Sequence, residues 1–431
     1  MPAAHEALDM PFDNPDGTDD VDESELTEEE ANETPESTQA RAHRLVADPL
    51  YHVIPVSRWA DALIALAPFR RLDGVSLSDV PGEILFGDLF PSRLTHSLGV
   101  YYLARQARPR DRALQVAALA HDLCHGPFSH LTEQLMIELL GVDHEHRSAA
   151  LLRNTIANAR GASARLLSWL DLDEVCALIT GEGTDGRSEL LNGTLDYDNI
   201  DNVARFAFSA GLSEPGYDGR ALARALRLTP GTDRDHVSLA DEHVPAAEAW
   251  QTDRAAVYRF LQTDAWNIAA HAMLRKAIDL TMTEGKLDWR FFDLTDNEAL
   301  HLLNSVTAAR PLLDRVTSDN PYLVIWESII PPDNQRIAAL FATASGRLTL
   351  EERIATEAGL RANEIVAMYV VSRVVRALPP LTSQAGATLS GAPDRLAERF
   401  VRVFAPTSLG RDYVRRARMA IERALGELGA L

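Results

Sequence analysis

A mostly α-helical fold is predicted for this chain of 431 residues, and three features of its sequence support that prediction. Hydrophobic side chains recur three and four positions apart through long stretches after residue 45, which is the periodicity of amphipathic helices. Runs of β-branched residues that would indicate strands are short and few. A hydrophobic content of 46% is ordinary for a globular protein with a substantial core.

The first 45 residues are expected to form a disordered acidic tail rather than part of that core. Residues 1–40 contain fourteen Asp or Glu and no Lys or Arg, so they carry most of the net charge of −21 and leave −7 for the remainder. A segment so rich in charge cannot bury enough apolar surface to offset the entropy lost on folding. Its simplest role is solvation, and nothing in the sequence indicates a basic face for nucleic-acid binding.

Four helices are expected in the part of the chain that follows this tail. Their periodic segments are 92–107, 111–123, 144–159 and 195–212. The second of these segments carries His121 and Asp122 close to its end, because the helix-breaking pair Gly126-Pro127 follows. The His-Asp pair is therefore expected at a helix terminus, where two adjacent side chains can turn toward one point.

The second half of the chain is expected to be mainly helical with a small α+β part. Residues 253–280 and 348–360 have helical periodicity, whereas 322–330 (YLVIWESII) is a short apolar run. Residues 378–394 have the composition of a linker or long loop. Residues 411–428 form a basic amphipathic pattern, which predicts a helix that docks onto the body of the protein or onto a neighbouring subunit.

These patterns divide the chain into a tail (1–45), a main domain (46–310) and a C-terminal region (311–431). No window approaches eighteen uninterrupted apolar residues, so no membrane association is expected, and no secretory signal is visible. Cys124 and Cys176 are the only cysteines, which excludes a disulfide framework and suits a reducing compartment. We therefore expect a cytoplasmic location.

A dense group of histidines indicates a metal site. Six of the thirteen histidines fall within residues 96–146, and the decapeptide HDLCHGPFSH alone contains three of them. A single buried histidine often does no more than hydrogen-bond a carbonyl group, but imidazole and carboxylate together form a mixed nitrogen and oxygen site for a divalent transition metal. His96 and the adjacent His121-Asp122 pair would supply three ligands, and Asp198 is the best candidate for a fourth.

Four short motifs resemble those of a known family. RLTHSLGV, ALAHDLCHGPFSH, HEHRS and LDYDNID look like successive motifs of the HD-domain metal-dependent phosphohydrolases. The branch that they resemble is that of the deoxynucleoside triphosphate triphosphohydrolases, which includes the SAM and HD domain dNTPases. The resemblance covers roughly residues 48–310, including the segment FFDLTDNEALHLL. It implies an HD-domain helical bundle core with a C-terminal helical or α+β extension.

The resemblance also assigns roles to individual side chains. The metal ligands of the family correspond to His96, His121, Asp122 and Asp198. Its catalytic histidines, which surround the phosphate, correspond to His125, His130 and His144. Acidic positions that orient one of these imidazoles correspond to Glu133 and Glu145. Arg93 matches the arginine that holds a substrate phosphate. The metal is left open among Mn, Fe, Mg, Co and Ni, since all of them accept such ligands.

The sequence departs from the triphosphatase pattern at two positions expected to contact substrate. Asn199 and Asn202 stand where that pattern has a lysine and a tyrosine. Our leading hypothesis is hydrolysis of a dNTP to a deoxynucleoside and tripolyphosphate. An HD-type nucleotidase or phosphodiesterase that acts on another phosphate ester is the second hypothesis, and a non-catalytic nucleotide-sensing module is the third. The expected partners are a nucleotide substrate, optionally a nucleotide effector, and further copies of the chain in a homo-oligomer.

Two further aspartates of the fourth helix have a structural interpretation. Asp196 is expected to cap the helix, and Asp201 is expected to pair with Arg205. Cys124 lies between two site residues, where we expect a small buried filler rather than a redox group.

Overall fold

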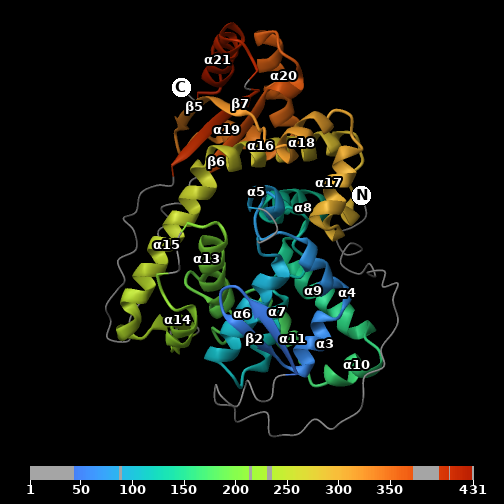
Figure 1. Ribbon diagram of the computed structural model, residues 1–431, viewed down its shortest axis with the longest axis vertical. Helices are drawn as coiled ribbons and strands as arrows, with labels where there is room; N and C mark the ends of the chain where they lie inside the picture. Colours follow the sequence, from blue (N-terminus) through green and yellow to red (C-terminus); the bar gives the residue numbers. More distant parts are fainter. Residues whose placement is uncertain are drawn as a thin grey trace.

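The computed structural model describes residues 43–86, 90–212, 216–230, 235–371, 398–406 and 408–429. It confirms the mostly α-helical prediction: helices form a body in the lower part of Figure 1, and a small sheet with its own helices lies above them. The predicted linker at 378–394 and residues 1–42 of the predicted tail lie outside the described residues. Within the ranges given above, no helix is long and apolar enough to cross a membrane.

A β-hairpin precedes the helices of the body. Strands β1 (Arg44–Asp48) and β2 (His52–Val56) pair antiparallel. The Asp48 carboxylate accepts hydrogen bonds from the backbone N–H groups of Leu50 (2.9 Å) and Tyr51 (2.7 Å), which stabilises the turn between the strands. The prediction that the disordered tail extends to residue 45 is therefore wrong at its C-terminal end, because pairing with β2 makes the chain regular from Arg44 onward.

The helices of the body follow this hairpin in chain order. They are α3 (Arg58–Ile64), α4 (Ala67–Arg71), α5 (Gly82–Phe86), α6 (Arg93–Ala107), α7 (Arg112–Ala120), α8 (Glu133–Leu140), α9 (His144–Asn158), α10 (Gly161–Leu166), α11 (Leu172–Ile179), α12 (Glu189–Asn192), α13 (Tyr197–Ser209) and α14 (Gly219–Ala225). A second antiparallel hairpin follows, with strands β3 (Leu226–Thr229) and β4 (His236–Leu239). Short 3₁₀ helices are η2 (Leu72–Gly74), η3 (Ser129–Thr132), η4 (Asp241–His243), η5 (Trp289–Asp293) and η6 (Ala362–Glu364).

The four helices predicted in this part of the chain are confirmed as α6, α7, α9 and α13. Each begins after a residue whose side chain accepts a backbone N–H of the first turn, and these caps are Ser92, Asp111, Asp143 and Asp196. Such caps satisfy donors that have no partner within the helix. The local sequence therefore sets where each of these helices starts.

Helices α6 and α13 pack closely because Gly99 lies where they meet. A Cβ atom at position 99 would lie 2.0 Å from Asp201 Oδ2 and 2.5 Å from Arg205 Nη2. No side chain larger than hydrogen fits at that distance without displacing the Asp201–Arg205 pair. The close approach brings His96, one turn before Gly99, against α13.

Two long helices connect the body to the C-terminal region. The segment 253–280, predicted from a helical pattern, is divided between α15 (Val244–Thr263) and α16 (Ala265–Thr283). Asp264 is the single residue between these two helices. Its side chain accepts a hydrogen bond from the Asn267 backbone N–H at 2.8 Å. This cap starts a new helix in a different direction, as Figure 1 shows. Helices α17 (Asp296–Asn304) and α18 (Arg310–Thr317) follow.

The C-terminal region is an antiparallel sheet covered by helices. Its strands have the order β5-β7-β6, with bounds β5 (Leu323–Ile330), β6 (Val366–Val371) and β7 (Arg399–Ala405). Its helices are α19 (Gln335–Ala342), α20 (Ala344–Ala358) and α21 (Arg411–Gly426). The apolar run at 322–330 is thus a strand. The C-terminal basic helix docks on this region of its own chain, where α21 packs against α20.

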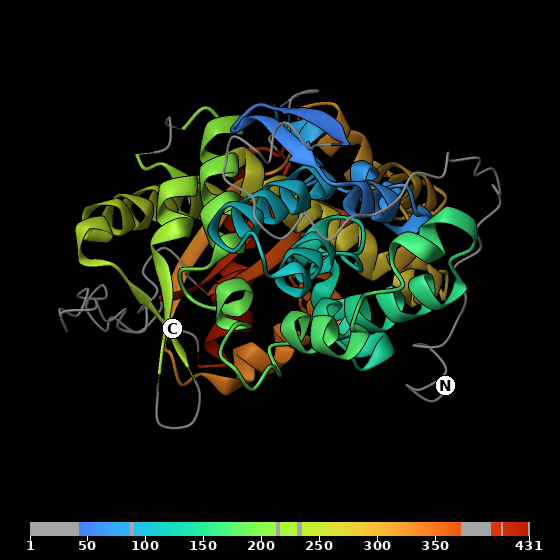
Figure 2. The ribbon, with the colours of Figure 1, turned by 90° about the horizontal axis from the view of Figure 1, so that it is seen from below.

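The described residues contain three large hydrophobic cores. The first fills the helical body, the second surrounds α16 and α18, and the third lies between the sheet and helices α20 and α21. The second core includes Phe128 of the body together with Phe404 of β7. Viewed from below in Figure 2, the sheet lies behind the helices of the body. The domain boundary near residue 310 stays a prediction, because this core is shared across it.

Two buried ion pairs join α16 to α20. Lys276 Nζ lies 2.9 Å from Glu351 Oε2, and Arg347 donates to both oxygens of Asp279 at 2.6 Å. All four side chains are buried. Charges removed from water are stable only while each has its partner, so these pairs require one relative placement of the two helices.

We expect Asp279→Ala to lower the free energy of unfolding by about 3–5 kcal/mol, because it leaves the buried Arg347 guanidinium without its partner. Arg415→Ala breaks an exposed ion pair with Asp412 on α21, so it is the control and should change stability by about 0–1 kcal/mol. Chemical denaturation followed by circular dichroism measures both. Equal effects of the two substitutions would contradict the assignment.

Candidate metal centre

The His-Asp pair lies at a helix terminus, as the Gly-Pro break predicted. Helix α7 ends at Ala120 and His121 is its C-cap residue. The His121 ring donates from Nδ1 to the Ala118 carbonyl at 2.9 Å, which leaves Nε2 to face the site. His121 Nε2 lies 3.4 Å from Asp122 Oδ1, so both neighbours turn toward one point.

His96 and Asp198 reach the same point from α6 and α13. His96 Nε2 lies 2.9 Å from Asp198 Oδ1 and 3.7 Å from Asp122 Oδ2. His121 Nε2 lies 3.9 Å from Asp198 Oδ1. The potential ligand atoms of His96, His121 and Asp122 lie within 4.8 Å of one another. The structure therefore brings together the four side chains predicted as ligands, and their role as ligands is taken up below as a proposal.

The chemistry of these side chains fits a divalent metal ion. Nε2 of His96 and Nε2 of His121 are buried, and each lies near carboxylate oxygens without a hydrogen bond of suitable geometry among the described residues. Buried polar atoms without partners are costly, and ligation would satisfy both of them. Burial lowers the pKa of His96, but Asp198 and Asp201 outweigh that effect and raise it to about 9. The carboxylates thus make the centre favourable for positive charge.

Asp201 contributes to this centre in a way that the sequence did not predict. It pairs with Arg205 as expected, with Nε and Oδ1 at 2.8 Å, but Oδ1 also accepts a hydrogen bond from His96 Nδ1 at 2.8 Å. Burial raises the pKa of Asp201, whereas Arg205 and His96 lower it to about 2, so the group stays ionised. A carboxylate on the far nitrogen of a ligating histidine fixes the ring orientation and its tautomer. Asp201 is therefore a positioning residue.

A second group of predicted side chains lies beside the first. His144 Nδ1 donates to Glu133 Oε1 at 2.6 Å, and His130 Nδ1 donates to Glu133 Oε2 at 3.0 Å. His125 stacks on His144 with ring centroids 4.0 Å apart. Glu145 Oε1 lies 3.9 Å from His144 Nε2. The three imidazoles and two carboxylates predicted as catalytic are thus gathered in one place.

The two stacked rings differ in their preferred protonation. Burial, Arg93 and His144 hold the pKa of His125 well below its usual range. Burial also lowers the pKa of His144, but its hydrogen bond to Glu133 outweighs burial and raises the pKa. A proton in this pair therefore resides on His144. Asp122, His125 and His144 also place potential ligand atoms within 4.8 Å of one another.

Arg93 lies between the metal centre and a cavity. Its Nη1 donates to Asp122 Oδ2 at 2.7 Å and its Nε donates to Ser129 Oγ at 3.0 Å. Asn202 lines the same cavity. Asn199, by contrast, donates from its amide to both oxygens of the Asp196 carboxylate and does not line the cavity. The structure therefore brings Arg93 and Asn202 to the expected place but directs the Asn199 side chain into the helix cap.

The segment after the His-Asp pair is held in an unusual conformation. Phe128 and Ser129 have φ angles of 63° and 51°, in the left-handed region that non-glycine residues seldom adopt. Asp296 accepts the Phe128 backbone N–H at 2.8 Å and the Ser76 backbone N–H at 2.9 Å. Arg71 donates to the His125 carbonyl at 2.6 Å. Sequence reasoning missed these roles; the only signal for Asp296 was its place in FFDLTDNEALHLL.

We expect His121→Ala to abolish stoichiometric metal binding while the protein stays folded, because α7 keeps its apolar core. His146→Ala is the matched control, since His146 is exposed and pairs with Asp143 and Glu182, neither of which is a candidate ligand. Elemental analysis of the purified proteins, with circular dichroism as the check on folding, measures the difference. Full metal content in His121→Ala would disprove the ligand assignment.

Asp201→Asn should weaken metal affinity by about 10–100-fold, the usual effect of changing a partner that orients a ligating histidine. Asp196→Asn on the same helix keeps a capping side chain and should leave affinity near the wild-type value. Competition with a chelator measures both dissociation constants. Equal affinities for the two variants would show that Asp201 serves only its pair with Arg205.

Comparison with known proteins finds the same motifs in a described family. Residues 93–208 match the HD domain. A deoxyguanosinetriphosphate triphosphohydrolase-like protein of Jannaschia sp. is 33% identical over 152 residues, which are 33% of this chain and 36% of that protein. The uncharacterized protein YwfO of Bacillus subtilis is 29% identical over 248 residues, which are 54% of this chain and 53% of that protein. The chain thus spans only part of the length of the curated relatives that it matches.

A solved structure shares the fold over more of the chain. A hypothetical protein from Aquifex aeolicus aligns with a TM-score of 0.64 and 19% identity, covering 88% of this chain and 99% of that chain. At this identity the likeness concerns the fold alone. The match at residues 93–208, the relatives and the gathered histidines and aspartates agree with one another. Residues 93–208 thus match the HD domain, and the chain is similar over part of its length to proteins named deoxyguanosinetriphosphate triphosphohydrolase-like.

Proposed function

We propose that this chain is a metal-dependent phosphohydrolase that acts on nucleotides and converts a dNTP to a deoxynucleoside and tripolyphosphate. The observation that carries the proposal is the convergence of His96, His121, Asp122 and Asp198 beside three further imidazoles and a cavity. The names of several relatives, deoxyguanosinetriphosphate triphosphohydrolase-like protein, support the choice of a dNTP.

The residues of the centre suit phosphoryl transfer to water. A divalent ion held by the four ligands supplies Lewis-acid polarisation of the phosphoryl group. The Arg93 guanidinium, fixed by Asp122 and Ser129, offsets negative charge on the phosphoryl oxygens. The His125 ring is stacked on His144 beside this group, with ring centroids 4.0 Å apart. The Arg93 guanidinium is already held by two partners, so the electrostatic stabilisation that it contributes is preorganised.

We assign to His144 the donation of a proton to the leaving oxygen. Its Nδ1 is held by Glu133, so Nε2 is directed away from Glu133 and toward the centre, 3.9 Å from Asp122 Oδ1. A carboxylate behind an imidazole stabilises the charged ring and fixes its orientation. His130 shares Glu133 and is partly exposed, which suits contact with a phosphate at the entrance.

A nucleotidase or phosphodiesterase acting on another phosphate ester is the second candidate. Among the described residues that line the cavity, Arg93 is the only Lys or Arg, and it already pairs with Asp122. A triphosphate carries more negative charge than one such guanidinium offsets. The nucleotide-sensing module remains the third candidate and predicts tight nucleotide binding without turnover.

A nucleotide panel tests these candidates. Metal-loaded protein is incubated with dNTPs, NTPs and nucleoside monophosphates, and tripolyphosphate is resolved from orthophosphate by ion chromatography. We expect tripolyphosphate from dNTPs. Orthophosphate alone would favour the second candidate. The His121→Ala protein serves as the background control.

His144→Ala should reduce kcat by about a hundred- to ten-thousandfold, the usual range for loss of a general acid. The loss should be smaller on a p-nitrophenyl phosphate ester, whose leaving group needs no proton. Metal content should stay intact, and His146→Ala should retain activity. Equal losses on both substrates would indicate substrate positioning, and loss of metal would identify His144 as a ligand.

The homo-oligomer, the nucleotide effector and the cytoplasmic location stay predictions. The homo-oligomer is supported by exposed apolar side chains of the edge strand β5, namely Leu323, Val324 and Ile329. Light scattering during size-exclusion chromatography, with and without dNTPs, measures both assembly and any effect of nucleotide on it.

A further inference from the structure

The cavity beside the metal centre is too large for a phosphate group alone. Its volume is about 280 Å³, nearly twice the roughly 150 Å³ of an engineered cavity that accommodates benzene. Arg93 and His130 lie on its wall, so one part of it adjoins the reacting position. A phosphate ester that reacts at the centre therefore has space for its leaving group here.

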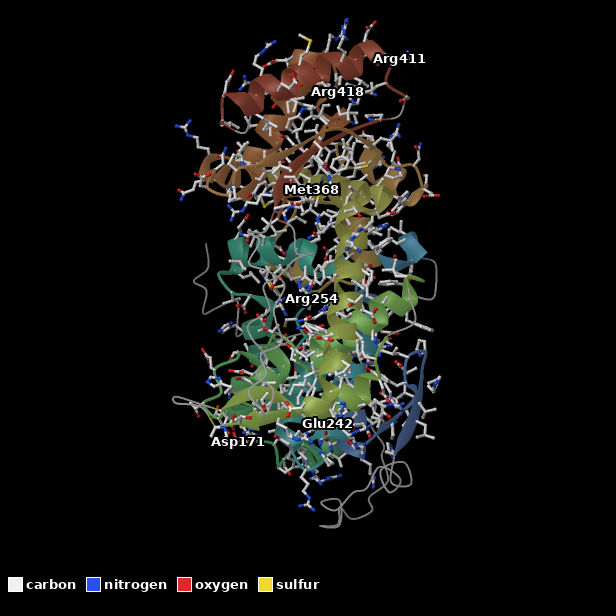
Figure 3. All side chains as sticks on the ribbon, turned by 90° about the vertical axis from the view of Figure 1, so that its left-hand side faces the viewer. Asp171, Glu242, Arg254, Met368, Arg411 and Arg418 are labelled. Atoms are coloured by element: carbon white, nitrogen blue, oxygen red, sulfur yellow. The ribbon has the colours of Figure 1, made fainter. Side chains whose placement is uncertain are left out.

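Apolar walls from four distant segments enclose this space. Phe206 comes from α13, Val257 from α15 and Ile268 from α16. Met368 and Val370 come from β6, so the C-terminal sheet completes a cavity that begins in the helical body. Figure 3 shows Met368 at the level where the sheet meets the body. Polar side chains, among them Asn202, Gln262 and Asn267, lie between these apolar ones, and a cavity that combines both suits an organic ring with polar substituents.

One polar pair stands out among these walls. His271 of α16 lines the cavity, and its Nδ1 lies 3.5 Å from Oδ2 of Asp79, which also lines it. Neither residue contributes to the metal centre or to the proton donor. Burial lowers the pKa of His271, with Arg275 acting in the same direction and Asp79 opposing it, so the ring is neutral at neutral pH. With N–H on the Nδ1 that faces the carboxylate, Nε2 is an acceptor.

We propose that this cavity is the leaving-group pocket and that His271, oriented by Asp79, is a specificity-determining residue that accepts a hydrogen bond from an N–H or O–H donor of the substrate's nucleoside. The inference rests on the proposed function, because it assumes that a nucleotide reacts at the centre. The donor is either an exocyclic amino group of the base or a sugar hydroxyl. 3-Methylthymidine, whose base has no N–H donor, separates the two sources by comparison with deoxycytidine.

Binding of the product nucleosides tests the pocket without hydrolysis. His271→Phe keeps a ring but removes both nitrogens, and should weaken deoxycytidine binding about fivefold, as loss of one neutral hydrogen bond does. His271→Gln keeps an acceptor oxygen and should recover part of the affinity. His301→Ala, an exposed histidine on α17, is the control. Isothermal titration calorimetry gives the dissociation constants. An equal effect on 3-methylthymidine identifies the sugar hydroxyl, and an effect on deoxycytidine alone identifies the amino group.

Kinetic measurements distinguish a role of His271 in substrate selection from a merely structural role. His271→Phe should raise KM for nucleotides and leave kcat/KM for p-nitrophenyl phosphate near the wild-type value, with metal content unchanged. Met368→Trp fills the pocket from the C-terminal sheet and should weaken nucleoside binding, which provides a second test if His271→Phe fails to fold. Equal losses on both substrates in His271→Phe, or nucleoside binding that neither variant changes, would overturn the inference.

These outcomes are distinct from failure of the proposed function. Nucleoside binding that depends on His271, without hydrolysis of any nucleotide, would refute the function and support the pocket. Nucleotide hydrolysis without any nucleoside binding by the wild-type protein would refute the pocket and leave the function standing.

Discussion

The Asp122 carboxylate is the group on which the rest of the site depends. It is buried, yet Arg93 lies 2.7 Å from it, His125 3.3 Å, His121 3.4 Å and His96 3.7 Å. Burial raises the pKa of a carboxyl group, but these neighbours, His121 and Arg93 foremost, hold the pKa of Asp122 well below its usual range. An ionised carboxylate out of water is tolerated only when cationic or donor groups surround it. The helices and loops around Asp122 keep those neighbouring groups in place.

That requirement explains several costly features around the centre. The left-handed residues Phe128 and Ser129 store strain that the surroundings must offset. Asp296 and Arg71, from parts of the chain far apart in sequence, do so through backbone hydrogen bonds. Gly99 allows α13 to approach α6 closely enough for the buried carboxylate of that helix to orient a ring. Each device costs stability locally and is useful only because of the centre.

Local patterns allowed much of the fold and the centre to be predicted. Helices α6, α7, α9 and α13 follow from periodicity and capping residues, and the Gly-Pro break predicted the position of His121 and Asp122 at a helix end. Contacts between residues 100 or more positions apart could not be predicted from such local patterns. The bond from His96 to Asp201 and the clamp by Asp296 depend on how helices pack, which spacing along the chain does not reveal. Asn199 is different, because its side chain is turned by a local hydrogen bond to Asp196, three residues earlier.

The cavity is lined by residues from inside and from outside the HD-domain match, which has a consequence for how the sequences of such proteins diverge. The HD-domain match ends at residue 208 and contains every candidate ligand, but α15, α16 and β6, which supply most of the cavity wall, lie beyond it. Substitutions in those later segments can reshape the pocket without touching a ligand. Chemistry and selectivity can therefore change independently in this architecture. Under the proposed pocket, a shared HD motif would be informative about the reaction at the phosphate, whereas the molecule that carries the phosphate would be selected in large part by segments that lie beyond the motif.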